Sequence, residues 1–127
     1  MKENKIEKVD LLKIDTEGNE KKVLVGSEDF INPSIIKSVQ FEYGGTYLDA
    51  GITLAEVVQL LMEKKYFVGK LFADHIKYEA DLGNFVEDYA YGNFVASDKK
   101  SIKHDWCFST RKNGKSNVSI CIWFYCC

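Results

Sequence analysis

Three carboxylates follow two short hydrophobic runs of the chain. Asp15 and Glu17 come directly after Val9–Ile14, and Glu42 lies near the end of Ile35–Tyr43. Because the carboxyl ends of parallel strands meet at one edge of a sheet, where ligands bind, we expect the three side chains to lie close together. Such carboxylates could act as a general base, bind the hydroxyl groups of a ligand, or hold a hard cation.

Each candidate group also has a plain structural alternative. The acidic pair around Thr16 could simply cap the following helix, since acidic residues favour a helix N-terminus. His75 and His104 have no partner at the spacing of a catalytic triad or a metal site, which favours ordinary loop histidines. The basic clusters in residues 99–103 and 111–115 are typical of solvated charge, because no nucleic-acid-binding motif accompanies them.

The elements that must position the carboxylates alternate between strand and helix. Val9–Ile14 is almost continuously hydrophobic, which predicts a strand buried on both faces. Asn19 is expected to cap a helix over residues 20–25. Ile35–Tyr43 is rich in β-branched and aromatic residues and predicts the second strand. Two glycines then open a predicted flexible loop over residues 44–51.

The second half of the expected fold begins with the best-specified helix. Thr53 and Glu56 form a T-x-x-E capping box, and apolar residues follow at helical spacing over residues 54–62. Strands are expected at 66–72 and 93–96. No helical pattern separates these two strands, so they should pair antiparallel. The order of elements predicts an α/β fold.

Composition and charge divide the chain near residue 97. The 127 residues are 46% hydrophobic and 28% charged, which is enough for a globular core. Residues 1–96 carry a net charge of −6, whereas residues 97–127 carry +4 and hold all four cysteines and both tryptophans. The overall charge of −2 gives no reason to expect nucleic acid as a partner. Without a visible secretory signal or a membrane-length apolar run, we expect a cytoplasmic protein that has no membrane partner.

The tail, defined as residues 97–127, has a different character. Its cysteines form no C-x-x-C pair, which favours free thiols over a zinc site or a disulfide framework. Ser116–Cys127 carries no charge and has strong β-propensity. Three alternatives stay open for this segment: an added edge strand, an exposed segment prone to aggregation, or sequence read past a frameshift.

One stretch of the sequence resembles a known enzyme family. Val9–Gly26 reads VDLLKIDTEGNEKKVLVG, and the next strand ends close to Glu42. Together they resemble the FkbM family of S-adenosylmethionine-dependent methyltransferases over roughly residues 6–96. The matching positions are Lys13–Glu20, Val23–Gly26 and Glu42.

The resemblance implies a fold and an activity. The fold is a Rossmann-like methyltransferase sheet of seven strands, the last of them antiparallel. In it, residues 9–14 and 35–43 form strands four and five, and residues 66–72 and 93–96 form strands six and seven. The activity is methyl transfer from S-adenosylmethionine to a hydroxyl oxygen. The implied partner is therefore a small-molecule or glycan hydroxyl.

The same resemblance implies roles for individual residues at the carboxyl ends of the strands. The catalytic candidates are Asp15, Glu17 and Glu42, and the substrate-binding candidates are Tyr43, Tyr47 and Asp49. Asp15 also faces the cofactor in this scheme, and it is the first candidate for the base that takes the proton of the acceptor.

The sequence also departs from the family. No glycine-rich turn of the kind that holds the cofactor occurs in it. We therefore expect the C-terminal half of a methyltransferase domain in residues 1–96, inactive alone, with an unpaired edge at Val9–Ile14 through which it could associate. Two alternatives stay open: a non-enzymatic α/β binding or assembly module, and a metal-dependent acid–base enzyme built on the three carboxylates.

Overall fold

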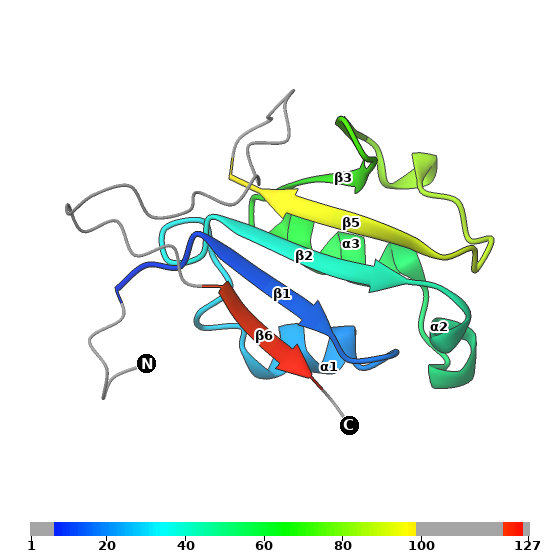
Figure 1. The fold of residues 1–127 in the computed structure, drawn as a ribbon, viewed down its shortest axis with the longest axis horizontal. Coiled ribbons are helices and arrows are strands. Elements are labelled where there is room, and N and C mark those ends of the chain that lie inside the picture. Colours follow the sequence, from blue (N-terminus) through cyan, green and yellow to red (C-terminus); the bar gives the residue numbers. More distant parts are fainter. Residues whose placement is uncertain (1–6, 99–120, 126–127) are drawn as a thin grey trace.

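A computed structural model describes residues 7–98 and 121–125, the latter by their backbone alone. The elements in chain order are β1 (Leu11–Asp15), α1 (Glu20–Gly26), β2 (Ser38–Tyr43), α2 (Gly45–Ala50), α3 (Leu54–Glu63), β3 (Phe67–Leu71), β4 (Ile76–Tyr78), the 3-10 helix η1 (Leu82–Asn84), β5 (Gly92–Ser97) and β6 (Cys121–Tyr125). The strands form one sheet in the order β4-β3-β5-β2-β1-β6 (Figure 1).

The sheet is mixed, with parallel pairing at one side and antiparallel pairing at the other. β1 is parallel to both β2 and β6. β5 lies between β2 and β3 and is antiparallel to both, and β3 and β4 form an antiparallel hairpin. The predicted α/β fold and the antiparallel pairing of the two later strands, β3 and β5, are confirmed, whereas β4 was not predicted.

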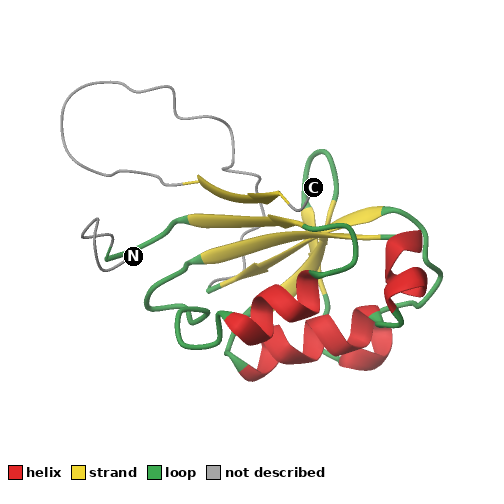
Figure 2. Cartoon of the chain, turned by 90° about the horizontal axis from the view of Figure 1, so that it is seen from below, coloured by secondary structure: helices red, strands yellow, loops and turns green. Residues whose placement is uncertain are grey.

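The helices α1 and α3 pack beside each other on one face of the sheet (Figure 2). The strands turn alternate side chains toward these helices, because successive residues of a strand point to opposite faces. Ile14, Phe41 and Phe94 are buried on this side, and α3 buries four apolar side chains against it. Those four are Leu54, Val57, Val58 and Leu61. The core therefore lies between the sheet and the pair of helices.

The capping box of α3 is formed as predicted. The Thr53 hydroxyl accepts a hydrogen bond from the Glu56 backbone N–H at 3.2 Å, and the Glu56 carboxylate accepts one from the Thr53 N–H at 2.8 Å. Lys21 of α1 adds an ion pair to the same carboxylate at 3.1 Å. These bonds hold the pKa of Glu56 below its usual range, with the Thr53 backbone bond the largest cause.

The prediction of a flexible loop over residues 44–51 is wrong, because residues 45–50 form α2. Tyr47 of this short helix is fully buried, and its ring meets the Tyr43 ring edge-on at 4.9 Å between centroids. Gly51 ends the helix in a left-handed conformation with φ of 69°. Burial of the tyrosine, which local sequence does not reveal, stabilises a helix that its glycines disfavour.

Asn19 occupies the N-cap position of α1, as predicted, but its side chain makes no capping hydrogen bond. Its side-chain amide instead donates to the Thr16 carbonyl at 3.1 Å. The free N–H groups of the preceding turn are bound by Glu20, the first residue of the helix. The helix itself lies where it was predicted and extends by one residue to Gly26.

The edge of β1 that was expected to be unpaired carries β6. The register runs in parallel from Leu11 with Cys121 to Asp15 with Tyr125. β6 therefore covers this edge of β1, and the edge-strand alternative holds for residues 121–125 of the tail. Association of the chain with a partner stays a prediction. The predictions for His104, the two basic clusters and cysteines 107, 126 and 127 lie outside the described residues. Within residues 7–98 and 121–125, no helix has the length and apolar character needed to cross a membrane.

Candidate active site

Asp15 and Glu42 lie at the same edge of the sheet, as the sequence predicts. Ile14 of β1 pairs with Phe41 of β2, and the two carboxylates follow one residue later on the same neighbouring strands. Both residues are partly buried. Lys13 places its amino group 3.9 Å from the Asp15 carboxylate. Because Asp15 and Glu42 follow two residues that face the helices, both belong to the opposite face of the sheet.

An exposed tyrosine contacts Glu42 from a distant part of the chain. The Tyr91 hydroxyl donates to the Glu42 carboxylate at 2.9 Å, although 70% of the residue is exposed. Its backbone lies over Gly44, where an added Cβ would stand 3.7 Å from the Tyr91 Cα. Sequence reasoning missed Tyr91, because 49 residues separate it from Glu42 and no local pattern joins the two.

The loop after β1 has an unusual backbone. Glu17 and Gly18 adopt positive φ angles of 52° and 102°, and the Glu17 side chain is exposed. Gly18 packs so closely on α2 that an added Cβ would lie 2.8 Å from the Thr46 carbonyl oxygen. Glycine is therefore required here both by conformation and by space.

A buried carboxylate holds this loop in place. Glu20 is only 1% exposed, and its two carboxylate oxygens accept the backbone N–H groups of Thr16 at 3.2 Å and Gly18 at 3.0 Å. From the sequence, Glu20 is predicted only as part of the family motif and as the start of a helix. The one local signal is an acidic residue in the first helical turn two residues after a glycine, and nothing in the sequence indicates its burial.

The two predicted substrate-binding tyrosines lie on the side of the sheet that faces the helices. Tyr43 follows Glu42 and therefore points to the opposite face; it is 2% exposed, and burial raises its pKa to about 12. Burial also raises the pKa of Tyr47 well above its usual range, and the nearby Glu20 carboxylate adds to this. Asp49 is exposed on α2. The roles of all three in substrate binding stay predictions.

Two buried hydroxyl groups near the loop lack a hydrogen-bond partner within the described part of the chain. They are the Thr16 Oγ1 and the Tyr47 phenol. Each such group costs roughly 1–3 kcal/mol unless a water satisfies it. These two hydroxyl groups make the surroundings of Glu20 more polar than the rest of the core.

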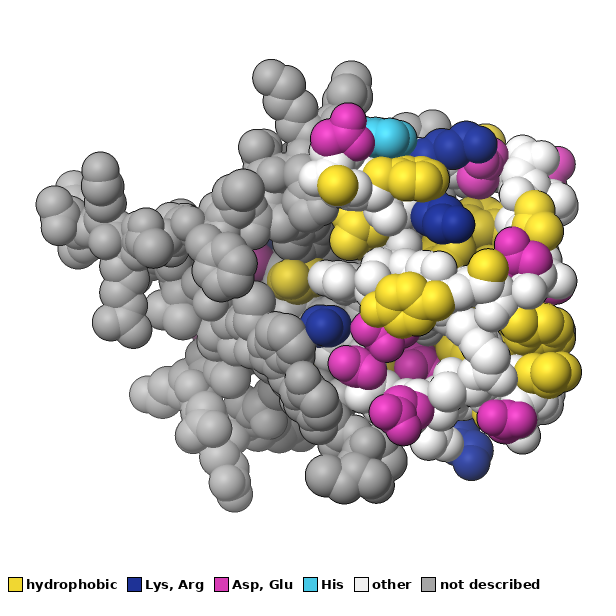
Figure 3. Space-filling view, turned by 45° about the vertical axis from the view of Figure 1, so that its right-hand side comes forward, with side chains coloured by type: hydrophobic (Ala, Val, Ile, Leu, Met, Phe, Trp, Pro, Cys, Tyr) yellow, Lys and Arg dark blue, Asp and Glu magenta, His cyan; other side chains and the backbone are white. Residues whose placement is uncertain are grey.

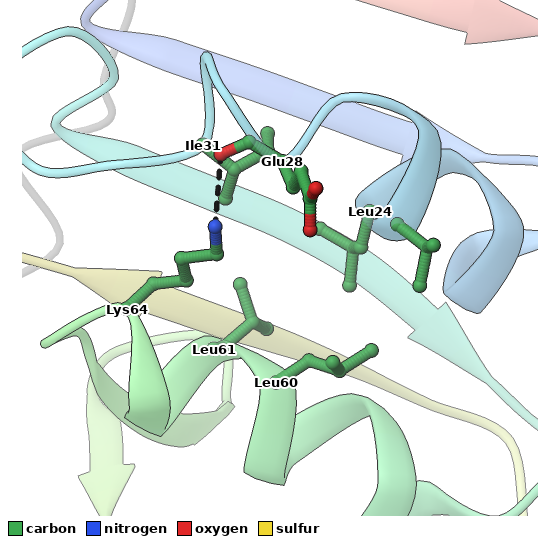
Figure 4. Close-up of a pocket in the computed structure, with 7 residues that line it drawn as sticks. Leu24, Glu28, Ile31, Leu60, Leu61 and Lys64 are labelled. Carbon is green, nitrogen blue, oxygen red and sulfur yellow. Dashed lines mark hydrogen bonds between the residues drawn. The ribbon is translucent and has the colours of Figure 1, made fainter.

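Asp15 and Glu42 lie at one end of the sheet, and a small crevice on the helix side of the sheet is lined by other residues. Figure 3, in which this end comes forward, shows acidic and hydrophobic side chains next to one another. The crevice, with a volume of about 30 Å³, lies between α1 and α3 (Figure 4). At its mouth, Lys64 donates to the Glu28 carbonyl at 2.8 Å. None of the predicted site residues lines this crevice.

The arrangement suits acid–base and hydrogen-bonding chemistry toward a ligand. Among residues 7–98, no group of three His, Cys, Asp or Glu side chains could hold a metal ion. The metal-dependent alternative therefore gains no support from them. Two carboxylates on adjacent strands, one bonded to an exposed phenol, can instead orient a hydroxyl group and accept its proton.

Comparison with known protein families gives a match over most of the chain. The family model of the methyltransferase FkbM domain matches residues 1–86, which include both carboxylates and the loop after β1. No curated protein and no solved structure matches the chain.

Proposed function

Because the chain belongs to the methyltransferase FkbM family, we propose that it forms the methyl-acceptor side of an S-adenosylmethionine-dependent methyltransferase domain. The acceptor is a hydroxyl oxygen of a sugar or small metabolite. The observation that carries this proposal is the position of Asp15 and Glu42, which follow a residue pair of two adjacent parallel strands at their carboxyl ends.

The sheet topology supports a Rossmann-like arrangement. In this proposal β1 and β2 are the fourth and fifth strands of the family fold, and β3 and β5 are the sixth and seventh. β5 runs antiparallel to its neighbours β2 and β3, which agrees with a last strand of opposite direction.

The proposed chemistry uses the two carboxylates differently. Methyl transfer to oxygen depends on the alignment of the acceptor hydroxyl and on the removal of its proton. We assign the removal of this proton to Asp15, whose carboxylate is partly exposed and lies 3.9 Å from the Lys13 amino group. Glu42, whose position is set by Tyr91, would accept a hydrogen bond from the acceptor. Glu17 lies farther out on the loop, where it could contact the ligand.

The residues do not fit the whole cofactor. Helix N-termini and adjoining loops bind charged ligands through free backbone N–H groups, but those of Thr16 and Gly18 are taken by Glu20. No glycine-rich turn occurs in the 127 residues. We therefore propose that this stretch of sequence binds S-adenosylmethionine weakly by itself, and that methyl transfer needs a glycine-rich cofactor-binding region that it does not contain.

Calorimetry tests the cofactor part of the proposal. Titration of S-adenosylmethionine into the 127-residue chain should give no saturable heat. Micromolar affinity would contradict the proposed division of the domain into acceptor and cofactor sides.

An NMR titration with monosaccharides and small polyols tests the acceptor part. We expect amide shifts near residues 15 and 42, and at least a tenfold weaker apparent affinity in Asp15→Asn and Glu42→Gln, about 1.4 kcal/mol. Asp10→Asn is the matched control, because Asp10 precedes β1 at its other end and pairs with Lys37 at 2.6 Å. Equal binding by all three variants, or no binding of any hydroxylated ligand, would count against the acceptor site.

A further inference from the structure

The segment that carries Tyr91 is attached to α3 by one carboxylate. We call residues 85–91, which lie between η1 and β5, the strap. Glu87 of the strap accepts the backbone N–H of Leu54 at 3.0 Å and that of Ala55 at 2.7 Å. These N–H groups belong to the first turn of the helix, where they have no partner within the helix itself. A surface carboxylate thus binds the strap to the start of α3.

A second set of bonds joins the strap to the core through Tyr43. The Tyr43 hydroxyl donates to the Glu87 carboxylate at 3.0 Å and accepts the Tyr89 backbone N–H at 2.9 Å. A phenol has one proton to give, so the bond to Glu87 leaves its oxygen lone pairs free for Tyr89. Tyr89 also stacks on the Tyr43 ring at 6.0 Å between centroids. Tyr89 has a positive φ of 53°, a conformation that costs energy in a residue other than glycine and persists only when its surroundings fix it.

The strap therefore passes from a fixed point at Glu87 to the exposed ring of Tyr91. Between them, Tyr89 is held by the Tyr43 phenol, and two residues later Tyr91 reaches the Glu42 carboxylate on the other side of the sheet. The chain of contacts joins the N-terminus of α3 to the proposed acceptor site.

We infer that Glu87 is a positioning residue for that site: its bonds to the first turn of α3 and to Tyr43 set the place of the Tyr91 ring beside Glu42. The role of this placement in acceptor binding rests on the proposed function. The placement of the ring by Glu87 is independent of that function. Tyr91 then offers an exposed aromatic face next to a carboxylate, which determines which acceptors fit.

Hydrogen exchange measured on the intact chain tests the placement. In Glu87→Ala the amides of Tyr89 and Ala55 should exchange at least tenfold faster than in the wild type. Glu56→Ala is the matched control, because Glu56 caps the same helix through Thr53 and does not bond to the strap. The control should accelerate exchange at Thr53 and leave Tyr89 unchanged. Unchanged exchange at Tyr89 in Glu87→Ala would overturn the inference.

The titration of Tyr43 tests the direct bond between its hydroxyl and the Glu87 carboxylate. Carbon-13 NMR of the tyrosine Cζ atoms should show Tyr43 titrating near pH 12 in the wild type. Burial is the largest cause of this raised pKa, and the Glu87 carboxylate adds to it. In Glu87→Gln, which keeps the size of the side chain and loses its charge, the Tyr43 pKa should fall but stay above its ordinary value of 10. An unchanged pKa would contradict the direct bond.

The acceptor titration then separates the inference from the proposed function. If hydroxylated ligands bind the wild type, Tyr91→Ala and Glu87→Ala should weaken their binding by similar factors. Glu87→Gln should weaken the binding less. Strong weakening in Tyr91→Ala with none in Glu87→Ala would overturn the positioning role. If no ligand binds the wild type, the acceptor proposal fails, and the exchange and titration results still decide the place of Glu87.

Discussion

The loop after β1 and the strap are both held by a glutamate that accepts two backbone N–H groups, but the two glutamates differ in burial. Glu20 is 1% exposed and binds N–H groups two and four residues before it. Glu87 is exposed and binds N–H groups that precede it by more than 30 residues. The same hydrogen-bond chemistry therefore supports one segment from inside the core and the other from the surface.

This difference determines how much each bond contributes to stability. A buried donor that loses its acceptor has no water to replace it, so the cost is the full desolvation penalty. Glu87 is an exposed acceptor, so water can take the place of its carboxylate when it is removed, and the cost is smaller. We expect changes at the buried loop to affect folding, and changes at the strap to affect mainly the local position of Tyr91.

The largest expected effect comes from Glu20→Ala. It leaves the N–H groups of Thr16 and Gly18 buried without an acceptor and opens a cavity, so the free energy of unfolding should fall by about 3 kcal/mol. Urea denaturation followed by circular dichroism measures this. Glu17→Ala, in the same loop but exposed, is the control and should change stability by less than about 0.5 kcal/mol. A loss below about 1 kcal/mol in Glu20→Ala would show that Glu20 is not the main support of the loop.

The next effect is that of Gly18→Ala. The new Cβ would meet the Thr46 carbonyl at 2.8 Å in a backbone conformation that alanine disfavours, so stability should fall by about 2 kcal/mol. Gly26→Ala is a matched control, because a Cβ there meets nothing within 4 Å and alanine favours the helix. The control should be neutral or more stable by up to about 1 kcal/mol. Equal destabilisation of the two variants would show that the close approach to α2 is unimportant.

Glu87→Ala should cost less, about 1 kcal/mol, which is typical for the loss of a helix cap. Thermal unfolding should show a small shift in the midpoint with unchanged cooperativity. A loss as large as that of Glu20→Ala would remove the contrast between the two segments, because it would mean that the strap is part of the core.

The smallest expected effect is a change in how the stability of the chain depends on pH. The pKa of Glu56 is lowered in the folded chain, so its stabilising contribution is present above the pKa of the unfolded state and is lost as the pH falls through the folded value. Because the side chain is 42% exposed, solvent screening limits this contribution to less than about 1 kcal/mol. In Glu56→Gln, the loss of stability between pH 5 and about pH 3 should be smaller than in the wild type. An identical pH dependence in the two proteins would contradict the shift.

The features predicted well from the sequence are those that depend only on neighbouring residues. The capping box of α3 needs only Thr53 and Glu56, and β1 and β2 are marked by their own hydrophobic runs. The position of Asp15 near Glu42 followed from two strand ends and one rule about parallel sheets. These predictions required no knowledge of the tertiary contacts.

The missed features depend on contacts between distant residues. α2 forms because Tyr47 is buried against Tyr43, although glycines flank the segment. Glu20 looks like any acidic residue at a helix start until the core closes around it. Tyr91 reaches Glu42 only once β5 lies beside β2. Local sequence patterns therefore do not predict α2, the burial of Glu20 or the contact between Tyr91 and Glu42.

The central place of β5 has a consequence for how the chain folds. The match to the family domain ends at residue 86, yet β5 begins at Gly92 and is the strand that joins β3 and β4 to β2. During synthesis, β3 and β4 leave the ribosome before the strand that connects them to the rest of the sheet. Its residue Ser97 pairs with Ser38 of β2, which is far away in the sequence, and such distant pairings slow folding. The β3–β4 hairpin should therefore gain protection from hydrogen exchange late in refolding, together with β5.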